Sequence, residues 1–318
     1  MAHILFSVPV QQSDLNAIIE TFPNSIFHIH PNNNLEDLVI LEECEVIATF
    51  GHDLNVEIIK RMPKLKLVQV FKAGVDTLPL KELHEKKVLV SNVRGIHRIS
   101  VSELVFGCIL ALSQNLFTYR QNQQAHKWNR IIFKEEIFQK TIGIIGAGSI
   151  GQDIAKKAKA FGMYTLGLNT SGKPLAWFDQ VYPPDGLGEL LSASDYVLVS
   201  LPLTSKTYHF INEKHFTLMK PTSCFINIAR GQVVNEQALV DALKNKLIKN
   251  AILDVFDQEP LPPDSPLWEM ENVIITPHIG GVSPRYMERA LEIFKHNLSV
   301  YLNQGNNFIN LIDPARGY

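Results

Sequence analysis

Short apolar runs rich in β-branched residues alternate along the chain with segments whose apolar positions recur every three or four residues. The first runs are predicted as strands over residues 3–8, 25–29, 45–50, 65–71 and 88–90, with helical spacing at 15–21 and 56–62. Such alternation predicts parallel α/β architecture. These elements fill about the first 95 residues and form the first of two expected domains.

A second series of strands and helices follows. Its strands are predicted over residues 141–145, 164–168, 196–201, 224–228, 251–255 and 273–276. Six strands with crossover helices make a complete dinucleotide-fold sheet. Apolar residues from Val101 to Leu116 predict one long helix before this series, ending in the polar stretch 120–127. Ser100 and Glu103 match a capping box at its start, so we assign Glu103 to the helix backbone rather than to catalysis.

The last helix is predicted from Ser283 as N-cap and Pro284 as first residue, with Leu291 and Phe294 on one apolar face. Because the second sheet already has its six strands, this face is expected to pack on the first domain. The predicted fold is α/β, with two Rossmann-like doubly wound parallel-sheet domains, the first discontinuous. A substrate-binding domain is expected over residues 1–100 plus 286–318, and a dinucleotide-binding domain over residues 101–285.

Composition narrows the class of protein. The 318 residues are 46% hydrophobic and 19% charged, which suits a globular protein of two domains. The net charge of -2 gives no basic excess for nucleic acid, and no apolar run approaches the roughly 18 residues of a membrane helix. Cys44, Cys108 and Cys224 lack C-x-x-C spacing, which argues against a disulfide framework and a metal site and favours the cytoplasm.

Gly146, Gly148 and Gly151 form a G-x-G-x-x-G box between a predicted strand and a predicted helix. In that context the first glycine permits the turn, the second lets the backbone approach a pyrophosphate, and the third allows close packing of helix on strand. The backbone N–H groups of Ser149 and Ile150 are expected to bind phosphate oxygens. The alternative is a tight strand-to-helix turn without a ligand.

The residues after the next strand bear on the identity of the cofactor. NAD-specific sites carry a carboxylate there, which hydrogen-bonds to the adenosine ribose. In this chain the strand ends in Asn169, Thr170, Ser171, Gly172 and Lys173, without a carboxylate. Neutral donors and one cation suit a ribose phosphate and favour NADP. NAD remains the alternative, because Lys173 can equally be a solvated loop lysine.

Three further segments follow strands of the second sheet, at the edge where open α/β sheets bind ligands. Arg230 supplies a planar guanidinium that can grip a carboxylate through two hydrogen bonds. Asp254 and Glu259 supply carboxylates, and His278 places an imidazole in a glycine-rich turn. One such residue alone is usually a surface or packing residue, but residues at successive strand ends are expected to converge on one crevice.

Several segments together carry a family resemblance: LKLVQVFKAGVD, SNVRGIHRISVSE, TIGIIGAGSIG, SLPLTSKTYHFIN, FINIARGQVVNEQAL, LDVFDQEPLP and NVIITPHIGG. In this order they resemble the D-isomer-specific 2-hydroxyacid dehydrogenase family over nearly the whole chain. That family includes phosphoglycerate dehydrogenases and glyoxylate/hydroxypyruvate reductases. The resemblance implies hydride transfer between NAD(P)H and C2 of a small 2-oxo acid, giving a D-2-hydroxy acid.

The resemblance also implies roles for individual residues. Arg230 matches the arginine that binds the substrate carboxylate and polarises the carbonyl. His278 matches the proton donor, and Glu259 matches the glutamate that pairs with it and keeps it charged and oriented. Asp254 matches the residue that holds the nicotinamide carboxamide. The remaining cofactor contacts are expected from Leu201, Pro202, Thr207, Ile228, Ala229 and Gly280.

The resemblance places a second substrate-binding segment in the first domain. Ala73, Gly74 and Val75 match a loop whose backbone N–H groups also bind the carboxylate. Beside the expected substrate loops lie Phe71, Lys72, Arg94 and His97. Their cationic character favours a polar or phosphorylated substrate, and the alternative is that they are rim or packing residues.

Two other classes of function fit parts of the pattern. A non-catalytic dinucleotide-sensing scaffold can keep this fold, but the presence of Arg230, Glu259 and His278 favours an enzyme. An L-specific 2-hydroxyacid enzyme normally begins with its glycine box, whereas about 145 residues precede the box here. The resemblance further implies a homodimer formed through the nucleotide domain and its long first helix.

Overall fold

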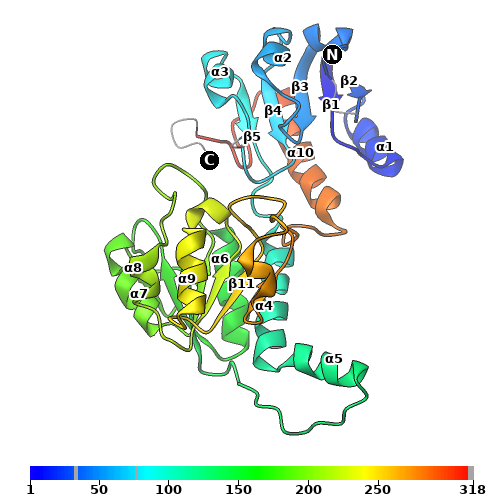
Figure 1. Cartoon of the computed structure of the whole chain (residues 1–318). Coiled ribbons are helices and arrows are strands. Elements are labelled where there is room, and N and C mark those ends of the chain that lie inside the picture. Colours follow the sequence, from blue (N-terminus) through cyan, green and yellow to red (C-terminus); the bar gives the residue numbers. More distant parts are fainter. Residues whose placement is uncertain (32–34, 76, 314–318) are drawn as a thin grey trace. The chain divides into compact units, whose positions relative to one another are not determined.

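The computed structural model describes residues 1–31, 35–75 and 77–313. The chain forms two compact units: unit 1 contains residues 1–96 and the segment from Ser283 onward, and unit 2 contains residues 97–282. Each unit is a parallel sheet flanked by helices (Figure 1). The predicted fold class, two Rossmann-like parallel-sheet domains of which the first is discontinuous, is confirmed.

Unit 1 has a five-stranded parallel sheet of order β2-β1-β3-β4-β5. Its strands are β1 (Ala2–Phe6), β2 (Ser25–Ile29), β3 (Cys44–Thr49), β4 (Leu67–Val70) and β5 (Leu89–Ser91). Its helices are α1 (Gln12–Thr21), α2 (Val56–Lys60), α3 (Leu80–Glu85) and α10 (Tyr286–Leu302), with a short 3₁₀ turn η1 (Val39–Glu42). The central strands are apolar almost without alternation because helices cover both faces of the sheet.

The C-terminal helix α10 is part of the core of unit 1. Phe294 is fully buried, and its ring lies edge-on to Phe6 with centroids 4.9 Å apart. Asn297 is also fully buried, and its Nδ2 donates to Gln69 Oε1 at 2.9 Å and to Ser91 Oγ at 2.8 Å. These bonds tie α10 to β4 and β5, so residues from the two ends of the chain complete one core.

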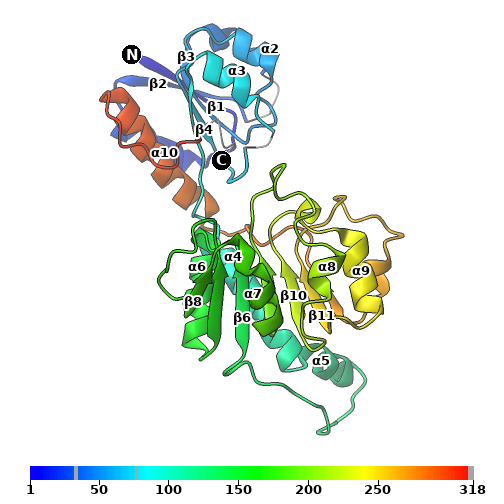
Figure 2. The same cartoon turned by 90° about the vertical axis from the view of Figure 1, so that its left-hand side faces the viewer.

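Unit 2 has a seven-stranded parallel sheet of order β12-β11-β10-β9-β6-β7-β8 (Figure 2). Its strands are β6 (Thr141–Ile145), β7 (Tyr164–Leu168), β8 (Gln180–Tyr182), β9 (Tyr196–Val199), β10 (Cys224–Asn227), β11 (Asn250–Leu253) and β12 (Val273–Ile275). Six of these strands were predicted. The seventh, β8, is a three-residue edge strand whose sequence QVY is too short to show a periodicity.

The helices of unit 2 are α4 (Arg98–Ser113), α5 (Leu116–Gln124), α6 (Ser149–Ala160), α7 (Leu187–Ala193), α8 (Glu213–Phe216) and α9 (Glu236–Lys244). Short 3₁₀ turns are η2 (Pro184–Gly186), η3 (Gly231–Val233) and η4 (Pro266–Glu269). Within the described residues no single helix is long and apolar enough to cross a membrane. Together α4 and α5 meet the length and composition requirements, with a bend of 66° between them.

The predicted start and end of the long helix in unit 2 are both wrong. The helix α4 begins at Arg98, so Ser100 lies in its first turn and donates its hydroxyl hydrogen bond to the His97 carbonyl at 3.2 Å. Ser100 therefore does not form the predicted capping box with Glu103. The helix ends at Ser113, and Asn115, at a left-handed φ of 55°, separates it from α5. Serine bonds backbone groups on either side of a helix start, which makes the exact start hard to predict.

The predicted start of the C-terminal helix is also displaced. The helix α10 begins at Tyr286, two residues after Pro284. Ser283 Oγ accepts a hydrogen bond from the backbone N–H of Arg285 at 3.2 Å, in the turn before the helix. Ser283 thus organises a turn that leads into α10 rather than capping the helix itself.

Candidate active site

The predicted site residues of unit 2 lie where its strands end. β6 leads into Gly146, β10 into Arg230, β11 into Asp254 and β12 into His278. In a parallel sheet these carboxyl ends share one edge, which is the usual ligand-binding edge. Because β10, β11 and β12 are neighbours in the sheet, their three loops lie side by side.

The glycine box joins β6 to α6 as predicted. Gly146 has a φ of +102°, and a Cβ there would lie 2.8 Å from the Ser200 carbonyl oxygen. A Cβ on Gly151 would lie 2.6 Å from the Gly146 carbonyl oxygen, so helix and turn are in close contact. By contrast, a Cβ on Gly148 would meet no described heavy atom within 4 Å. The open space before Gly148, at the start of α6, fits a dinucleotide phosphate.

The loop after β7 is organised by Asn169. Its Oδ1 accepts hydrogen bonds from Ser171 N at 2.9 Å, Ser171 Oγ at 3.1 Å and Gly172 N at 2.7 Å. Thr170, Ser171 and Lys173 are exposed. Asn169 therefore fixes the loop conformation, and its neighbours are the residues that present a hydroxyl or ammonium group to solvent.

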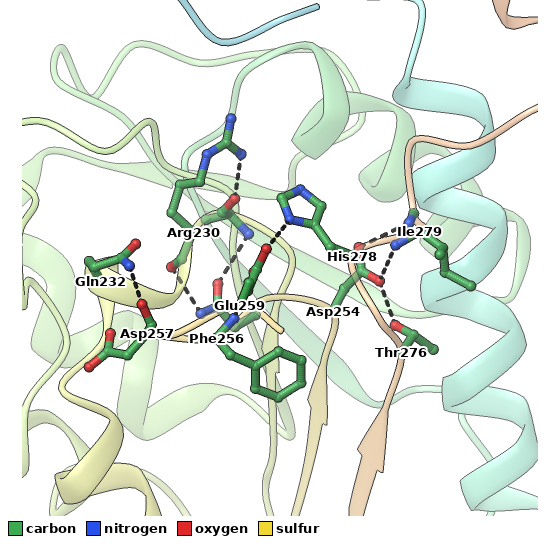
Figure 3. A network of polar contacts seen from close by, with 12 residues as sticks. Arg230, Gln232, Asp254, Phe256, Asp257, Glu259, Thr276, His278 and Ile279 are labelled. Carbon is green, nitrogen blue, oxygen red and sulfur yellow. Dashed lines mark hydrogen bonds and ion pairs between the residues drawn. The ribbon is translucent and has the colours of Figure 1, made fainter. Parts of the chain in front are cut away.

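Glu259 and His278 form an ion pair. Glu259 Oε2 lies 2.7 Å from His278 Nδ1 (Figure 3). The other carboxylate oxygen accepts the backbone N–H of Phe256 at 3.0 Å, which fixes the orientation of Glu259. The side chains of His278 and Glu259 are 46% and 35% exposed, so a substrate can reach the imidazole. The carboxylate fixes the orientation of the imidazole ring through Nδ1.

Asp254 supports the turn that carries His278. Its Oδ1 accepts hydrogen bonds from Thr276 Oγ1 at 2.5 Å and Ile279 N at 3.0 Å, and its Oδ2 accepts from Gly280 N at 2.9 Å. Both carboxylate oxygens are therefore bonded within the protein, and the side chain is 4% exposed. These bonds hold His278 at its left-handed φ of 53°. The nicotinamide contact expected of Asp254 stays a prediction.

Arg230 lies on the loop next to the Glu259 loop (Figure 3). Its Nη1 donates to the Ala229 carbonyl at 2.7 Å, and the buried Asn227 donates to the Arg230 carbonyl at 3.2 Å. A Cβ on Gly231 would lie 1.9 Å from the carbonyl carbon of Phe256, so the two loops are in backbone contact. The guanidinium and the ion pair are thus presented by adjoining, tightly packed loops.

His97, which precedes α4, also belongs to this region. A Cβ on Gly281 would lie 2.8 Å from His97 Cδ2, so the ring packs against the turn that follows His278. Burial, and to a lesser extent the Arg230 guanidinium, lowers the pKa of His97 to about 4. His97 is therefore neutral at neutral pH and does not serve as a proton donor there.

The structure shows supporting residues that sequence reasoning missed. Asn227 fixes the Arg230 turn by accepting the Ala229 N–H at 3.1 Å, and Thr276 donates to Asp254. Both lie inside the quoted motifs, but a motif does not show which backbone or side-chain group each one contacts.

The other predicted residues lie on two further loops. Thr207 Oγ1 donates to the Pro202 carbonyl at 2.6 Å, which closes the loop that begins at Leu201 after β9. Ile228 and Ala229 lie between β10 and Arg230. Ala73, Gly74 and Val75 follow β4 in unit 1, where the buried Asn92 donates to the Ala73 carbonyl at 2.6 Å. They are therefore not in the unit that carries Arg230 and His278.

Comparisons with known proteins agree with this arrangement. Residues 106–280 match the family described as D-isomer-specific 2-hydroxyacid dehydrogenase, NAD-binding domain. A glyoxylate reductase of Korarchaeum cryptofilum is 31% identical over 277 residues, covering 82% of this chain and 80% of that protein.

Solved structures of the same family are similar to this chain over nearly its whole length. A D-isomer-specific 2-hydroxyacid dehydrogenase family protein of Aeromonas salmonicida has a TM-score of 0.88 and 32% identity, covering 98% of this chain and 99% of that one. A D-isomer-specific 2-hydroxyacid dehydrogenase of Xanthobacter autotrophicus, solved with NADPH and MES, has a TM-score of 0.84 and 27% identity, covering 100% and 99%.

Proposed function

This chain belongs to the D-isomer-specific 2-hydroxyacid dehydrogenase family, and from that premise we propose that Arg230, Glu259 and His278 carry its reaction. The protein is an NAD(P)-dependent oxidoreductase that transfers a hydride between the nicotinamide and C2 of a small 2-oxo acid, giving a D-2-hydroxy acid. The observation that carries the residue assignment is the 2.7 Å Glu259–His278 ion pair beside the Arg230 loop. We further propose unit 1 as the substrate-binding domain and unit 2 as the dinucleotide-binding domain.

The cofactor is proposed to bind along the carboxyl edge of the unit 2 sheet. Gly148, Ser149 and Ile150 are proposed to bind its pyrophosphate, and the open space at Gly148, at the start of α6, supports this. When bound, the nicotinamide supplies or accepts the hydride. The further contacts proposed for it come from Gly146, Gly151, Leu201, Pro202, Thr207, Ile228, Ala229, Asp254 and Gly280.

The residues of the chain bind the acid and move the proton. The Arg230 guanidinium uses one N–H on Ala229, so its other donors can bind a carboxylate and polarise the adjacent carbonyl. Protonated His278 gives its Nε2 proton to the alkoxide that develops at C2. Glu259 bonds Nδ1, which leaves Nε2 as the nitrogen that faces the substrate. The backbone N–H groups of Gly74 and Val75 are proposed as further carboxylate donors.

The function is tested with a panel of 2-oxo acids. Glyoxylate, hydroxypyruvate, pyruvate, phosphohydroxypyruvate and branched 2-oxo acids are each assayed with NADH and with NADPH. We expect turnover of at least one acid to its D-2-hydroxy acid, identified by chiral chromatography. Binding of the cofactor without turnover of any acid would favour the dinucleotide-sensing scaffold instead.

We propose NADPH as the preferred cofactor, because no carboxylate stands at Asn169. Replacing Asn169 with Asp should lower the NADPH to NADH ratio of kcat/KM by about tenfold, because the new charge repels a 2′-phosphate and suits a ribose hydroxyl. Aspartate can keep the three hydrogen bonds that Oδ1 accepts, so the loop should persist. Lys244→Gln, on α9, is the control and should leave the ratio unchanged. A wild-type enzyme tenfold better with NADH would overturn the assignment.

We also propose a homodimer formed through unit 2. α5 and the segment after it stand away from the sheet of unit 2 (Figures 1 and 2). Their apolar side chains are unusually exposed: Trp128 is 93%, Ile131 94% and Phe133 79% exposed. A second copy of the chain would bury this surface and the adjoining cavity of about 500 Å³, which Phe117 and Phe133 help to line.

The homodimer is tested by sedimentation or light scattering. We expect twice the chain mass of 35.9 kDa for the wild type and a single chain mass for the Trp128→Ser, Ile131→Ser double variant. Val39→Ser removes an 86% exposed apolar side chain from unit 1 and should leave the dimer intact. A wild-type protein of one chain mass at micromolar concentration would exclude the proposal.

We place the protein in the cytoplasm. Cys44, Cys108 and Cys224 are separate, buried thiols, as suits a reducing compartment. Burial, and to a lesser extent the Glu43 carboxylate, raises the pKa of Cys44 to about 11, so this thiol stays protonated and unreactive.

A further inference from the structure

We infer that Lys72 selects, among 2-oxo acids, those that carry a second anionic group, and this inference rests on the proposed function. Lys72 directly precedes the Ala73 to Val75 loop, after β4. If the common carboxylate binds at Gly74, the Cα of Lys72 lies at most about 7 Å from the Cα of that residue. Charges interact over about 8 Å at physiological ionic strength, so an ammonium on this side chain can act on an anionic group elsewhere in the same small acid.

The ammonium of Lys72 is held in place by an aromatic ring. Its Nζ lies 5.7 Å from the ring centroid of Phe50, at the end of the neighbouring strand β3. The Phe50 ring in turn stacks on His52, with centroids 6.4 Å apart and planes 12° apart. A ring positions a cation without neutralising it, so the full charge remains available to an anion.

The Lys72 backbone is also fixed. Its carbonyl accepts the Val93 N–H at 3.3 Å, and the next carbonyl, that of Ala73, accepts the Asn92 amide at 2.6 Å. Asn92 Oδ1 accepts the backbone N–H of Arg94 at 3.0 Å, which brings a second exposed cation to this loop. Lys72 and Arg94 therefore flank the segment proposed to bind the substrate carboxylate.

The charge at this edge of unit 1 is positive in the part of the chain that the structure describes. Among residues 1–31, 35–75 and 77–313, no carboxylate forms an ion pair with Lys72 or Arg94. The carboxylate of Asp53, near His52 in the sequence, is buried and accepts the Thr49 hydroxyl. Asp76 lies outside the described residues. An ammonium that is fixed by a ring, and that has no carboxylate partner among the described residues, is suited to bind an anionic substituent.

The selected substrates share an anionic group at the end of the acid remote from C1. That group can be a carboxylate or a phosphate, and two pairs of 2-oxo acids of similar size distinguish these cases. Oxaloacetate against 2-oxobutanoate tests a second carboxylate, and phosphohydroxypyruvate against hydroxypyruvate tests a phosphate. Since both members of a pair carry the C1 carboxylate, the ratio of their kcat/KM values reports the second charge alone.

The expected result is a wild-type preference of about tenfold or more for the anionic member of at least one pair, which declines as salt is added. Lys72→Gln should lower kcat/KM for that member about tenfold and change its neutral partner less than about threefold. Lys72→Arg should retain the preference because it keeps the charge. Lys60→Gln is the matched control: Lys60 ends α2, which runs back from the carboxyl edge of the sheet, and it already pairs with Glu57 at 2.7 Å.

Equal kcat/KM values within both pairs, or an equal loss for both members in Lys72→Gln, would overturn the inference and leave the proposed function intact. Calorimetric binding of D-malate and D-2-hydroxybutyrate to the whole chain with NADP⁺ gives a readout without turnover. Tighter binding of D-malate that is lost in Lys72→Gln supports the inference even when no acid is reduced, and in that case the proposed function alone fails. Where no acid is reduced, equal binding of the two acids rejects the inference.

Discussion

Replacing His278 with asparagine should lower kcat/KM for 2-oxo acid reduction by about 10²- to 10⁴-fold, the usual contribution of a positioned general acid. Asparagine adopts the left-handed conformation that position 278 requires, so the turn held by Asp254 should persist. Thermal unfolding and the Kd for NADPH should therefore stay close to wild type. Near-normal turnover would remove His278 from the chemistry.

The carboxylate partner is tested by Glu259→Gln. Glutamine can still accept the Phe256 N–H, but it lacks the negative charge that complements a proton-donating imidazole. Because His278 is proposed to act as the proton donor, kcat/KM for 2-oxo acid reduction should fall in this variant. The Kd for NADPH should stay close to wild type.

A matched control keeps this experiment specific. Asp257→Asn removes one negative charge from the same loop and should leave kcat/KM unchanged. Burial and Arg230 lower the pKa of His97 to about 4, so this histidine does not replace His278 as proton donor near neutral pH. Equal kcat/KM values for wild type and Glu259→Gln would leave Glu259 a purely structural role.

The sequence predicted the parts of this molecule that depend on local pattern. The strand that precedes Gly146, the helix that follows it, and the positions of Arg230, Asp254 and His278 after successive strands all follow from apolar periodicity and glycine spacing. The shared edge of a parallel sheet then brings Arg230 and His278 into one region without any knowledge of tertiary contacts.

Other features depend on contacts between segments far apart in the sequence. Asp254 reads as a ligand-binding carboxylate, yet in the structure it accepts three hydrogen bonds from residues 276–280. The local sequence predicts Ser100 and Ser283 as helix N-caps. In the structure Ser100 donates to the His97 carbonyl, and Ser283 accepts the Arg285 N–H in the turn before α10. In these cases the polar side chain has several possible hydrogen-bond partners, and tertiary packing determines which of them it contacts.

Lysine in place of Arg230 should lower kcat/KM for a 2-oxo acid about tenfold or more, which corresponds to about 1.36 kcal/mol or more of transition-state stabilisation. In the structure one guanidinium nitrogen, Nη1, donates to the Ala229 carbonyl. Within residues 1–31, 35–75 and 77–313 its other donors form no hydrogen bond, so they can form two parallel bonds to a carboxylate. A lysine ammonium is a single point of contact, so it cannot keep the Ala229 bond and present a fork to the substrate.

The kcat/KM and the Kd for NADPH together show whether Arg230→Lys removes a substrate contact or disrupts the loop. Asn227 and Gly231 fix the loop through backbone contacts that do not involve the guanidinium, so the Kd for NADPH should change by less than about threefold, equivalent to about 0.7 kcal/mol. Arg285→Lys, at an exposed arginine paired with Glu288, is the control and should leave kcat/KM unchanged. Near-full activity of Arg230→Lys, or a loss confined to NADPH binding, would show that the carboxylate is bound elsewhere. A loss in kcat/KM for every 2-oxo acid with cofactor affinity retained is the pattern expected of a guanidinium that binds the carboxylate.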